Sequence, residues 1–125
     1  MKKKKVMVVD DELDLLKMLK LNLENTDKYE VQTMSDAGNI IALVKLFQPD
    51  IILMDILMPK VNGAQACKML KDDPEVRHIP IITLTALDTE KDKIIMFGLG
   101  VADFLTKPIG HDELITKIEK VLKDK

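Results

Sequence analysis

Four short apolar runs of this chain each end in polar residues whose side chains suit phosphate chemistry. These residues are Asp10, Asp11, Asp55, Thr85 and Lys107. A carboxylate can attack phosphorus as a nucleophile, and Mg²⁺ accepts carboxylates as ligands together with phosphate oxygens. A lysine ammonium and a hydroxyl can neutralise charge on a phosphoryl group during its transfer. The set predicts a phosphoryl-accepting site if the fold brings the four runs together.

Carboxylates that lie close together also predict a bound cation. Two of them ~4 Å apart repel each other by about 4 kcal/mol at an effective dielectric constant near 20. Mg²⁺ relieves such repulsion, because it takes oxygen ligands and keeps several waters. Each residue alone has a structural explanation, since Asp is common in turns and Asp11 or Glu12 could simply start a helix. The joint placement of all five residues favours the functional interpretation.

The apolar runs predict five β-strands that alternate with five helices. The first, third and fourth runs are continuous and do not alternate with polar residues, as is typical of parallel strands covered by helices on both faces. The expected strands span residues 5–9, 30–34, 51–54, 79–84 and 102–106.

Helical periodicity marks the segments between these strands. The last expected helix has one apolar side, made of Leu114, Ile115, Ile118, Val121 and Leu122. The first is expected to bury one stripe, made of Leu13, Leu16, Leu19 and Leu23. The fourth is expected to begin at Thr89, with Asp92 in an acidic variant of the capping box. Gly63 is expected to let the loop after Asp55 turn before a helix begins.

This alternation predicts an α/β fold with a doubly wound, five-stranded parallel sheet, (βα)₅, in the flavodoxin-like order 2-1-3-4-5. In that order the first and third strands are neighbours, and their crossovers leave in opposite directions. A crevice therefore opens at their carboxyl ends. We expect Asp10, Asp11 and Asp55 at this crevice, with Thr85 and Lys107 on its other side.

Length and composition predict one domain spanning residues 1–125. The chain has 46% hydrophobic and 32% charged residues, with no apolar run near the ~20 residues of a membrane span. Its formal net charge of −2 argues against direct nucleic-acid binding. The lysines at positions 2–5 precede a stretch too short for a secretory signal, so we expect a cytoplasmic protein with no membrane partner. Cys67, the only cysteine, is expected to be a small buried residue.

Over about residues 4–122, the chain resembles the receiver domain of two-component response regulators. Asp11 and Asp55 are 44 residues apart (55 minus 11), and Asp55 and Thr85 are 30 apart (85 minus 55). Thr85 and Lys107 are 22 apart (107 minus 85). These separations agree with the family pattern, and so do the accessory residues Met58, Pro59, Ala86 and Pro108.

The resemblance implies a role for each acidic residue. Asp55 would accept a phosphoryl group from a phosphohistidine on a histidine kinase or a histidine phosphotransfer protein. Asp11 would bind Mg²⁺ directly, Asp10 would hold it largely through water, and Asp55 would also belong to the metal site. The backbone carbonyl of Leu57 would complete the protein ligands.

The resemblance also implies a switch formed by Thr85 and Phe104. On phosphorylation the Thr85 hydroxyl would bond to the phosphoryl group, and the Phe104 ring would turn inward. The family more often has Tyr at this last position. Lys107 would contact a phosphoryl oxygen, and its bond to Pro108 is expected to be cis.

A downstream protein is expected to bind the face formed by the fourth helix, the fifth strand and the last helix, by which receivers also dimerise. Residues 94–97 are four consecutive apolar residues that cover all sides of a helix, so we expect three in the core and at least one exposed. The chain would catalyse only its own phosphorylation and slow hydrolysis, and would not be a turnover enzyme. Leu57 and Leu87 replace commoner polar residues beside the path of attacking water, and are expected to slow that hydrolysis.

Other classes of protein fit less well. A flavodoxin that binds flavin needs a hydroxyl- and glycine-rich phosphate loop after the first strand, where Asp10, Asp11 and Glu12 would repel phosphate. A Mg²⁺-dependent aspartyl-phosphate phosphatase of the haloacid dehalogenase type needs a second acid where Leu57 stands. A purely structural module would be expected to lose one of the five residues, and none is lost.

Overall fold

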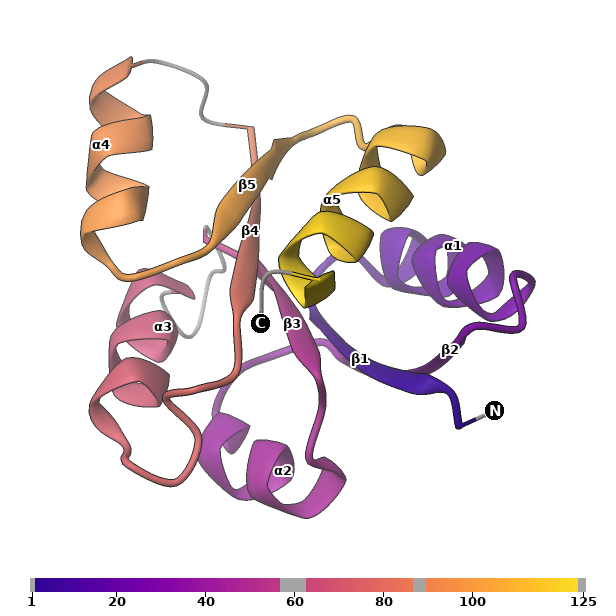
Figure 1. Cartoon of the computed structure of the whole chain (residues 1–125). Coiled ribbons are helices and arrows are strands. Elements are labelled where there is room, and N and C mark those ends of the chain that lie inside the picture. The colour runs from indigo at the N-terminus through magenta and orange to yellow at the C-terminus, as the bar shows by residue number, and fades with distance from the viewer. Residues whose placement is uncertain (1, 57–62, 87–89, 124–125) are drawn as a thin grey trace.

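The computed structural model describes residues 2–56, 63–86 and 90–123. Strands and helices alternate along the chain (Figure 1). In chain order they are β1 (Lys4–Val9), α1 (Leu13–Glu24), β2 (Tyr29–Met34), α2 (Ile40–Phe47), β3 (Ile51–Asp55), α3 (Gly63–Asp72), β4 (Ile81–Thr85), α4 (Glu90–Gly98), β5 (Asp103–Thr106) and α5 (His111–Lys123). Within the described part of the chain, no helix has both the length and the apolarity that crossing a bilayer requires.

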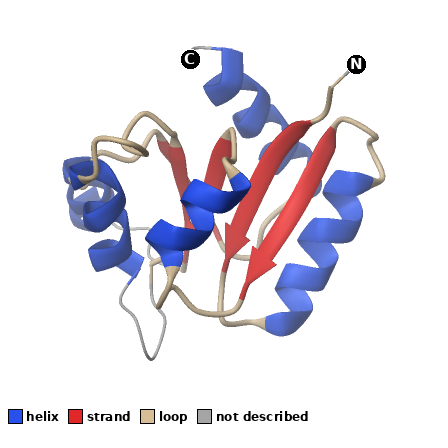
Figure 2. Cartoon of the chain, turned by 90° about the horizontal axis from the view of Figure 1, so that it is seen from below, coloured by secondary structure: helices blue, strands red, loops and turns tan. Residues whose placement is uncertain are grey.

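The strands form one parallel sheet in the order β2-β1-β3-β4-β5, which confirms the predicted fold class. Figure 2 shows the strand arrows running in the same direction. Every residue of β3 and β4 is buried, whereas the edge strand β2 begins with alternating buried and exposed residues. The continuous runs therefore belong to central strands, because only these are covered by helices on both faces.

Helices cover both faces of the sheet (Figure 1). One apolar cluster joins α2, α3 and α4 to one face and includes Val44, Leu70 and Met96. The other joins α1 and α5 to the opposite face and includes Leu19 and Ile118. This arrangement buries the strands and leaves their carboxyl ends at one edge.

The boundaries of β4 differ from the expected ones. The strand begins at Ile81, two residues later than predicted, and ends at Thr85. Pro80 precedes it and has no N–H to donate to a neighbouring strand, although its carbonyl accepts a hydrogen bond from Ile52 at 3.0 Å.

The predicted stripe of α1 was wrong at one position. Leu16, Leu19 and Leu23 are buried, but the side chain of Leu13 is 59% exposed. Three residues advance a helix by roughly 300°, so two such steps in succession turn the stripe by about 120°. Leu13 consequently lies beside the sheet-facing stripe and not on it.

Two expectations concern helix α4: the cap at its start and the burial of residues 94–97. Thr89 lies outside the described residues, as does the side chain of Asp92, so the expected capping box stays a prediction. Among residues 94–97, only Met96 is a described buried side chain, while Ile94 and Phe97 are 71% and 49% exposed. The expectation that three of the four belong to the core was wrong, because a helix at the edge of the sheet buries one narrow side.

Candidate functional site

The register of the strands brings the predicted site residues to one edge of the sheet. Val9 is paired with Met54, so Asp10 and Asp55 continue two neighbouring strands at the same level. The N–H of Asp10 donates to the carbonyl of Met34 at 3.0 Å and holds this residue in line with β1. Parallel pairing therefore places side chains that are 45 residues apart (55 minus 10) next to each other.

The same register brings the other two residues to this edge. Thr85 is paired with Thr106 at the ends of β4 and β5. The N–H of Lys107 donates to the carbonyl of Thr85 at 2.7 Å, which extends the pairing by one residue. The Thr85 side chain is buried.

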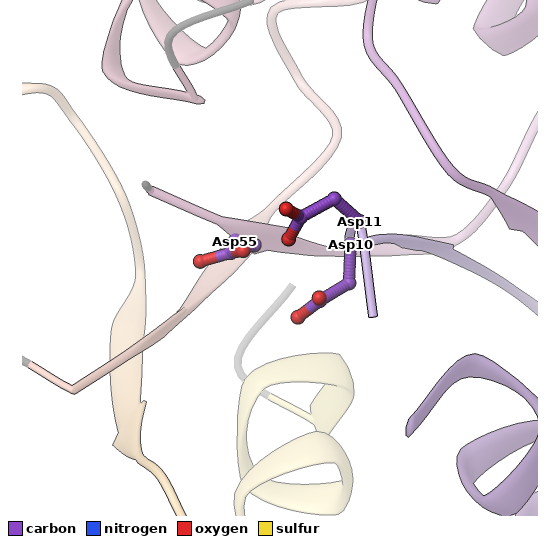
Figure 3. A group of neighbouring side chains, drawn as sticks. All are labelled: Asp10, Asp11 and Asp55. Carbon is purple, nitrogen blue, oxygen red and sulfur yellow. The ribbon is translucent and has the colours of Figure 1, made fainter. Parts of the chain in front are cut away.

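Three carboxylates form the centre of the site. One oxygen of Asp10, one of Asp11 and one of Asp55 all lie within 4.8 Å of one another. In Figure 3 the side chains of Asp10 and Asp11 leave the end of β1 on the side of Asp55. Asp10 and Asp55 are 0% and 3% exposed, whereas Asp11 is exposed. The cluster is thus open to solvent on the side of Asp11.

Lys107 supplies a positive charge to this cluster. Its Nζ lies 2.9 Å from Oδ2 of Asp10 and 3.6 Å from Oδ2 of Asp55. It also lies 2.8 Å from Oε1 of Glu12, to which it donates a hydrogen bond. Burial by itself would lower the pKa of the Lys107 ammonium, but the contacts with Glu12 and Asp10 and the charge of Asp55 outweigh it and raise the pKa well above its usual range.

Glu12 is the member of this arrangement that the sequence did not assign to the site. It directly precedes α1, where it was expected only as a helix start. Lys107 lies 95 residues further along the chain, and nothing local in the sequence relates the two.

The donor atoms at this site fit a hard divalent cation. Three carboxylates, of Asp10, Asp11 and Asp55, form the cluster, and the Lys107 ammonium contacts Asp10, Glu12 and Asp55. Oδ2 of Asp10 is buried and accepts no hydrogen bond from the described residues, because Lys107 approaches it as an ion pair without hydrogen-bond geometry. A buried, under-satisfied carboxylate oxygen in an all-oxygen cluster is suited to Mg²⁺.

Gly63 packs directly against the backbone that carries Asp55. Its N–H donates to the carbonyl of Ile56 at 2.9 Å. A Cβ at this position would overlap the carbonyl oxygen of Asp55 and come within 2.7 Å of the Cα of Ile56. Glycine is therefore required here for close approach, which is a reason that the sequence did not predict.

Phe104 links the fifth strand to the two helices beside it. Its ring meets that of Phe97 edge to face, with 5.9 Å between the centroids. Nζ of Lys117 lies 4.9 Å from the Phe104 centroid and donates a hydrogen bond to the Phe104 carbonyl at 2.6 Å. These contacts join α4, β5 and α5 through one partly buried side chain.

Two expectations about neighbouring residues have different outcomes. The peptide bond between Lys107 and Pro108 is cis, as predicted. Leu57 and Leu87 lie outside the described residues, together with Met58 and Pro59, so the expected carbonyl ligand and the expected water path stay predictions.

A family model for the response regulator receiver domain matches residues 6–119. The chain belongs to this family. Receiver domains take part in two-component signalling, interact with histidine kinases and downstream effectors, and generally bind Mg²⁺ at an acidic pocket. Family membership favours the receiver interpretation over the flavodoxin and phosphatase alternatives.

Named relatives agree with this assignment. Response regulator PleD of Caulobacter vibrioides is 39% identical over 121 residues, which are 97% of this chain and 26% of PleD. The alkaline phosphatase synthesis transcriptional regulatory protein PhoP of Bacillus subtilis is 36% identical over 120 residues, which are 96% of this chain and 49% of PhoP. The chain thus spans no more than about half the length of these two relatives.

Solved structures show the same fold. A response regulator from Chloroflexus aurantiacus has a TM-score of 0.90 at 30% identity, with 98% of this chain and 99% of that chain covered. Chemotaxis protein CheY4 of Vibrio cholerae has a TM-score of 0.89 at 26% identity, with 96% and 99% covered.

Proposed function

We propose that this receiver domain is a phosphorylation-dependent switch in which Asp55 accepts a phosphoryl group from a histidine kinase or a histidine phosphotransfer protein. One observation carries the proposal, namely the grouping of Asp10, Asp11 and Asp55, with the Lys107 ammonium 2.9 Å from Asp10 and 3.6 Å from Asp55. Such a grouping pairs a nucleophilic oxygen with the charges that phosphoryl transfer requires.

The chemistry is an in-line displacement at phosphorus. An oxygen of Asp55 forms the new bond to phosphorus, the bond from phosphorus to the donor imidazole nitrogen breaks, and that nitrogen keeps the electron pair. Lys107 starts 3.6 Å from Asp55, close enough to pair with a phosphoryl oxygen attached there. Mg²⁺, held by Asp10, Asp11, Asp55 and the carbonyl of Leu57, would neutralise charge on the transferred group.

The switch would act through Thr85 and Phe104. The Thr85 hydroxyl would form a hydrogen bond to the phosphoryl group, and the Phe104 ring would then turn inward. Because Phe104 touches Phe97 and Lys117, its movement would change the surface of α4, β5 and α5. A downstream protein, or a second copy of this chain, would bind that surface. Exposed Ile94 offers it an apolar contact.

The phosphorylated state would be long-lived. Leu57 and Leu87 would flank the path of water to the acyl phosphate and exclude it. In the double variant Leu57→Asn, Leu87→Glu, we expect phosphoryl-Asp55 to decay faster than in the wild type, as followed by phosphate release. An unchanged lifetime would contradict this role.

The remaining parts of the proposal concern the protein as a whole. Residues 1–125 would act as one receiver domain in the cytoplasm, with no direct contact to nucleic acid or membrane. The domain would catalyse its own phosphorylation and slow hydrolysis, without turning over an external substrate.

Phosphorylation can be tested with a small phosphodonor. The protein is incubated with acetyl phosphate and Mg²⁺, and its intact mass is measured. We expect a single phosphoryl addition in the wild type and none in Asp55→Ala. Absence of the addition in the wild type, or its persistence in the variant, would refute the proposal.

A further inference from the structure

Glu12 occupies a capping position without acting as a cap. It precedes α1 with an extended backbone, and its side chain makes no capping hydrogen bond. Its N–H donates to Oδ1 of Asp10 at 2.9 Å, which ties its backbone to the carboxylate cluster. Its Oε1 instead accepts the hydrogen bond from Nζ of Lys107 at 2.8 Å. The Glu12 side chain therefore binds the Lys107 ammonium and not the start of the helix.

Lys107 is shared between Glu12 and two members of the metal-binding cluster. Its contact with Glu12 has hydrogen-bond geometry, whereas its 2.9 Å contact with Oδ2 of Asp10 does not. The distance to Asp55 is longer still, at 3.6 Å. An ammonium that rested fully on Asp10 and Asp55 would repel a metal ion seeking the same oxygens.

We infer that Glu12 is a positioning residue that draws the Lys107 ammonium toward its own side of the cluster, and so limits the competition of Lys107 with Mg²⁺ for Asp55 before phosphorylation. The inference rests on the proposed function. The Glu12 side chain is 59% exposed, and exposed ion pairs are weak. Lys107 can therefore leave Glu12 at little cost when a phosphoryl oxygen becomes its partner.

The test uses a substitution that keeps the charge of Glu12 but shortens its side chain. Glu12→Asp retains the carboxylate, but it is one methylene shorter, so the carboxylate withdraws from the present position of the Lys107 ammonium. Mg²⁺ affinity is measured by titration calorimetry in the wild type, Glu12→Asp, Lys107→Met and the double variant. We expect Glu12→Asp to weaken Mg²⁺ binding about fivefold, the size of a good exposed ion pair.

The Lys107→Met background is the matched control. There is no ammonium to position in that background, so Glu12→Asp should change Mg²⁺ affinity by less than about twofold. Glu12→Gln keeps the length of the side chain but removes its charge. It should weaken Mg²⁺ binding in both backgrounds, but more strongly when Lys107 is present. Unfolding curves in chelator show whether each variant is folded, and the Gln series replaces the Asp series if Glu12→Asp is not.

The outcomes separate this inference from the proposed function. Equal affinities of the wild type and Glu12→Asp would overturn the positioning role while leaving Mg²⁺ binding intact. An equal loss with and without Lys107 would also overturn it, because Glu12 would then act on the metal by itself. A wild type that binds no Mg²⁺ would overturn the proposed function and the inference together.

Discussion

At the scale of single residues, the position of Asp55 depends on a neighbour that has no side chain. Gly63 donates to the carbonyl of Ile56 and leaves no room for a Cβ beside the Asp55 carbonyl. Both obstructing groups belong to the backbone, so they cannot rotate away as a flexible side chain would. The close approach of α3 to the end of β3 therefore constrains the backbone that carries the Asp55 carboxylate.

Gly63→Ala should consequently destabilise the protein and slow phosphorylation. We expect a loss of about 1–3 kcal/mol in the free energy of unfolding, typical of overpacking, measured by urea denaturation. Gly98→Ala is the matched control, because a Cβ there meets nothing within 4 Å, and it should be neutral or stabilise α4 by up to about 1 kcal/mol. Equal stabilities of the two variants would contradict the packing argument.

Cys67 shows a residue whose role was predictable from its type. It is fully buried in α3, and burial raises the pKa of its thiol to about 11. The thiol is therefore neutral near pH 7 and packs as a small apolar group, as the sequence predicted.

At the scale of elements, α1 has two functions that lie on different parts of the helix. Its buried side chains join the cluster that covers β1 and β3, while its N-terminus carries Glu12 beside the site. The exposed position of Leu13 means that only part of the leucine pattern holds the helix in place.

Two substitutions on α1 should separate the buried stripe from the exposed face. Leu16→Ala removes a side chain that is 5% exposed, and we expect a loss of about 2–5 kcal/mol in the free energy of unfolding. Leu13→Ala removes one that is 59% exposed, and should change stability by no more than about 0.5 kcal/mol. Denaturation in urea measures both, and a large loss at Leu13 would place it in the core after all.

At the scale of the whole molecule, the carboxylate cluster of Asp10, Asp11 and Asp55 should couple metal binding to stability. Asp10 and Asp55 are buried at the edge of a sheet whose central strands are fully covered, so their mutual repulsion is borne by the folded state. The unfolded chain separates these residues and loses the site. A cation that binds the cluster therefore stabilises the fold.

Mg²⁺ should raise the melting temperature of the protein. At about 100 times its dissociation constant, the stabilisation is roughly 2.7 kcal/mol. The measurement is differential scanning calorimetry with Mg²⁺ or chelator, with NaCl at equal ionic strength as control. Asp11→Asn removes an exposed carboxylate of the cluster and should lose most of this increment, and an undiminished increment would show that the metal binds elsewhere.

Local patterns in the sequence determined the architecture. Continuous apolar runs predicted β1, β3 and β4, because burial on both faces removes the need for alternation. The alternation of strands and helices, with right-handed crossovers, predicted a doubly wound parallel sheet, for which the flavodoxin-like order was the expected one. With that order, the sequence alone placed Asp10, Asp55, Thr85 and Lys107 at one edge of the sheet, where the strand register now aligns them.

Only the tertiary structure decided which side chains meet. The hydrogen bond between Lys107 and Glu12 depends on the reach of two long side chains across 95 residues, and no local pattern encodes it. The obstruction at Gly63 depends on how closely α3 approaches β3, and the exposure of Ile94 and Phe97 depends on the small contact area of α4. A sequence specifies the periodicity of each element, but distances between elements are set by the packing of all of them together.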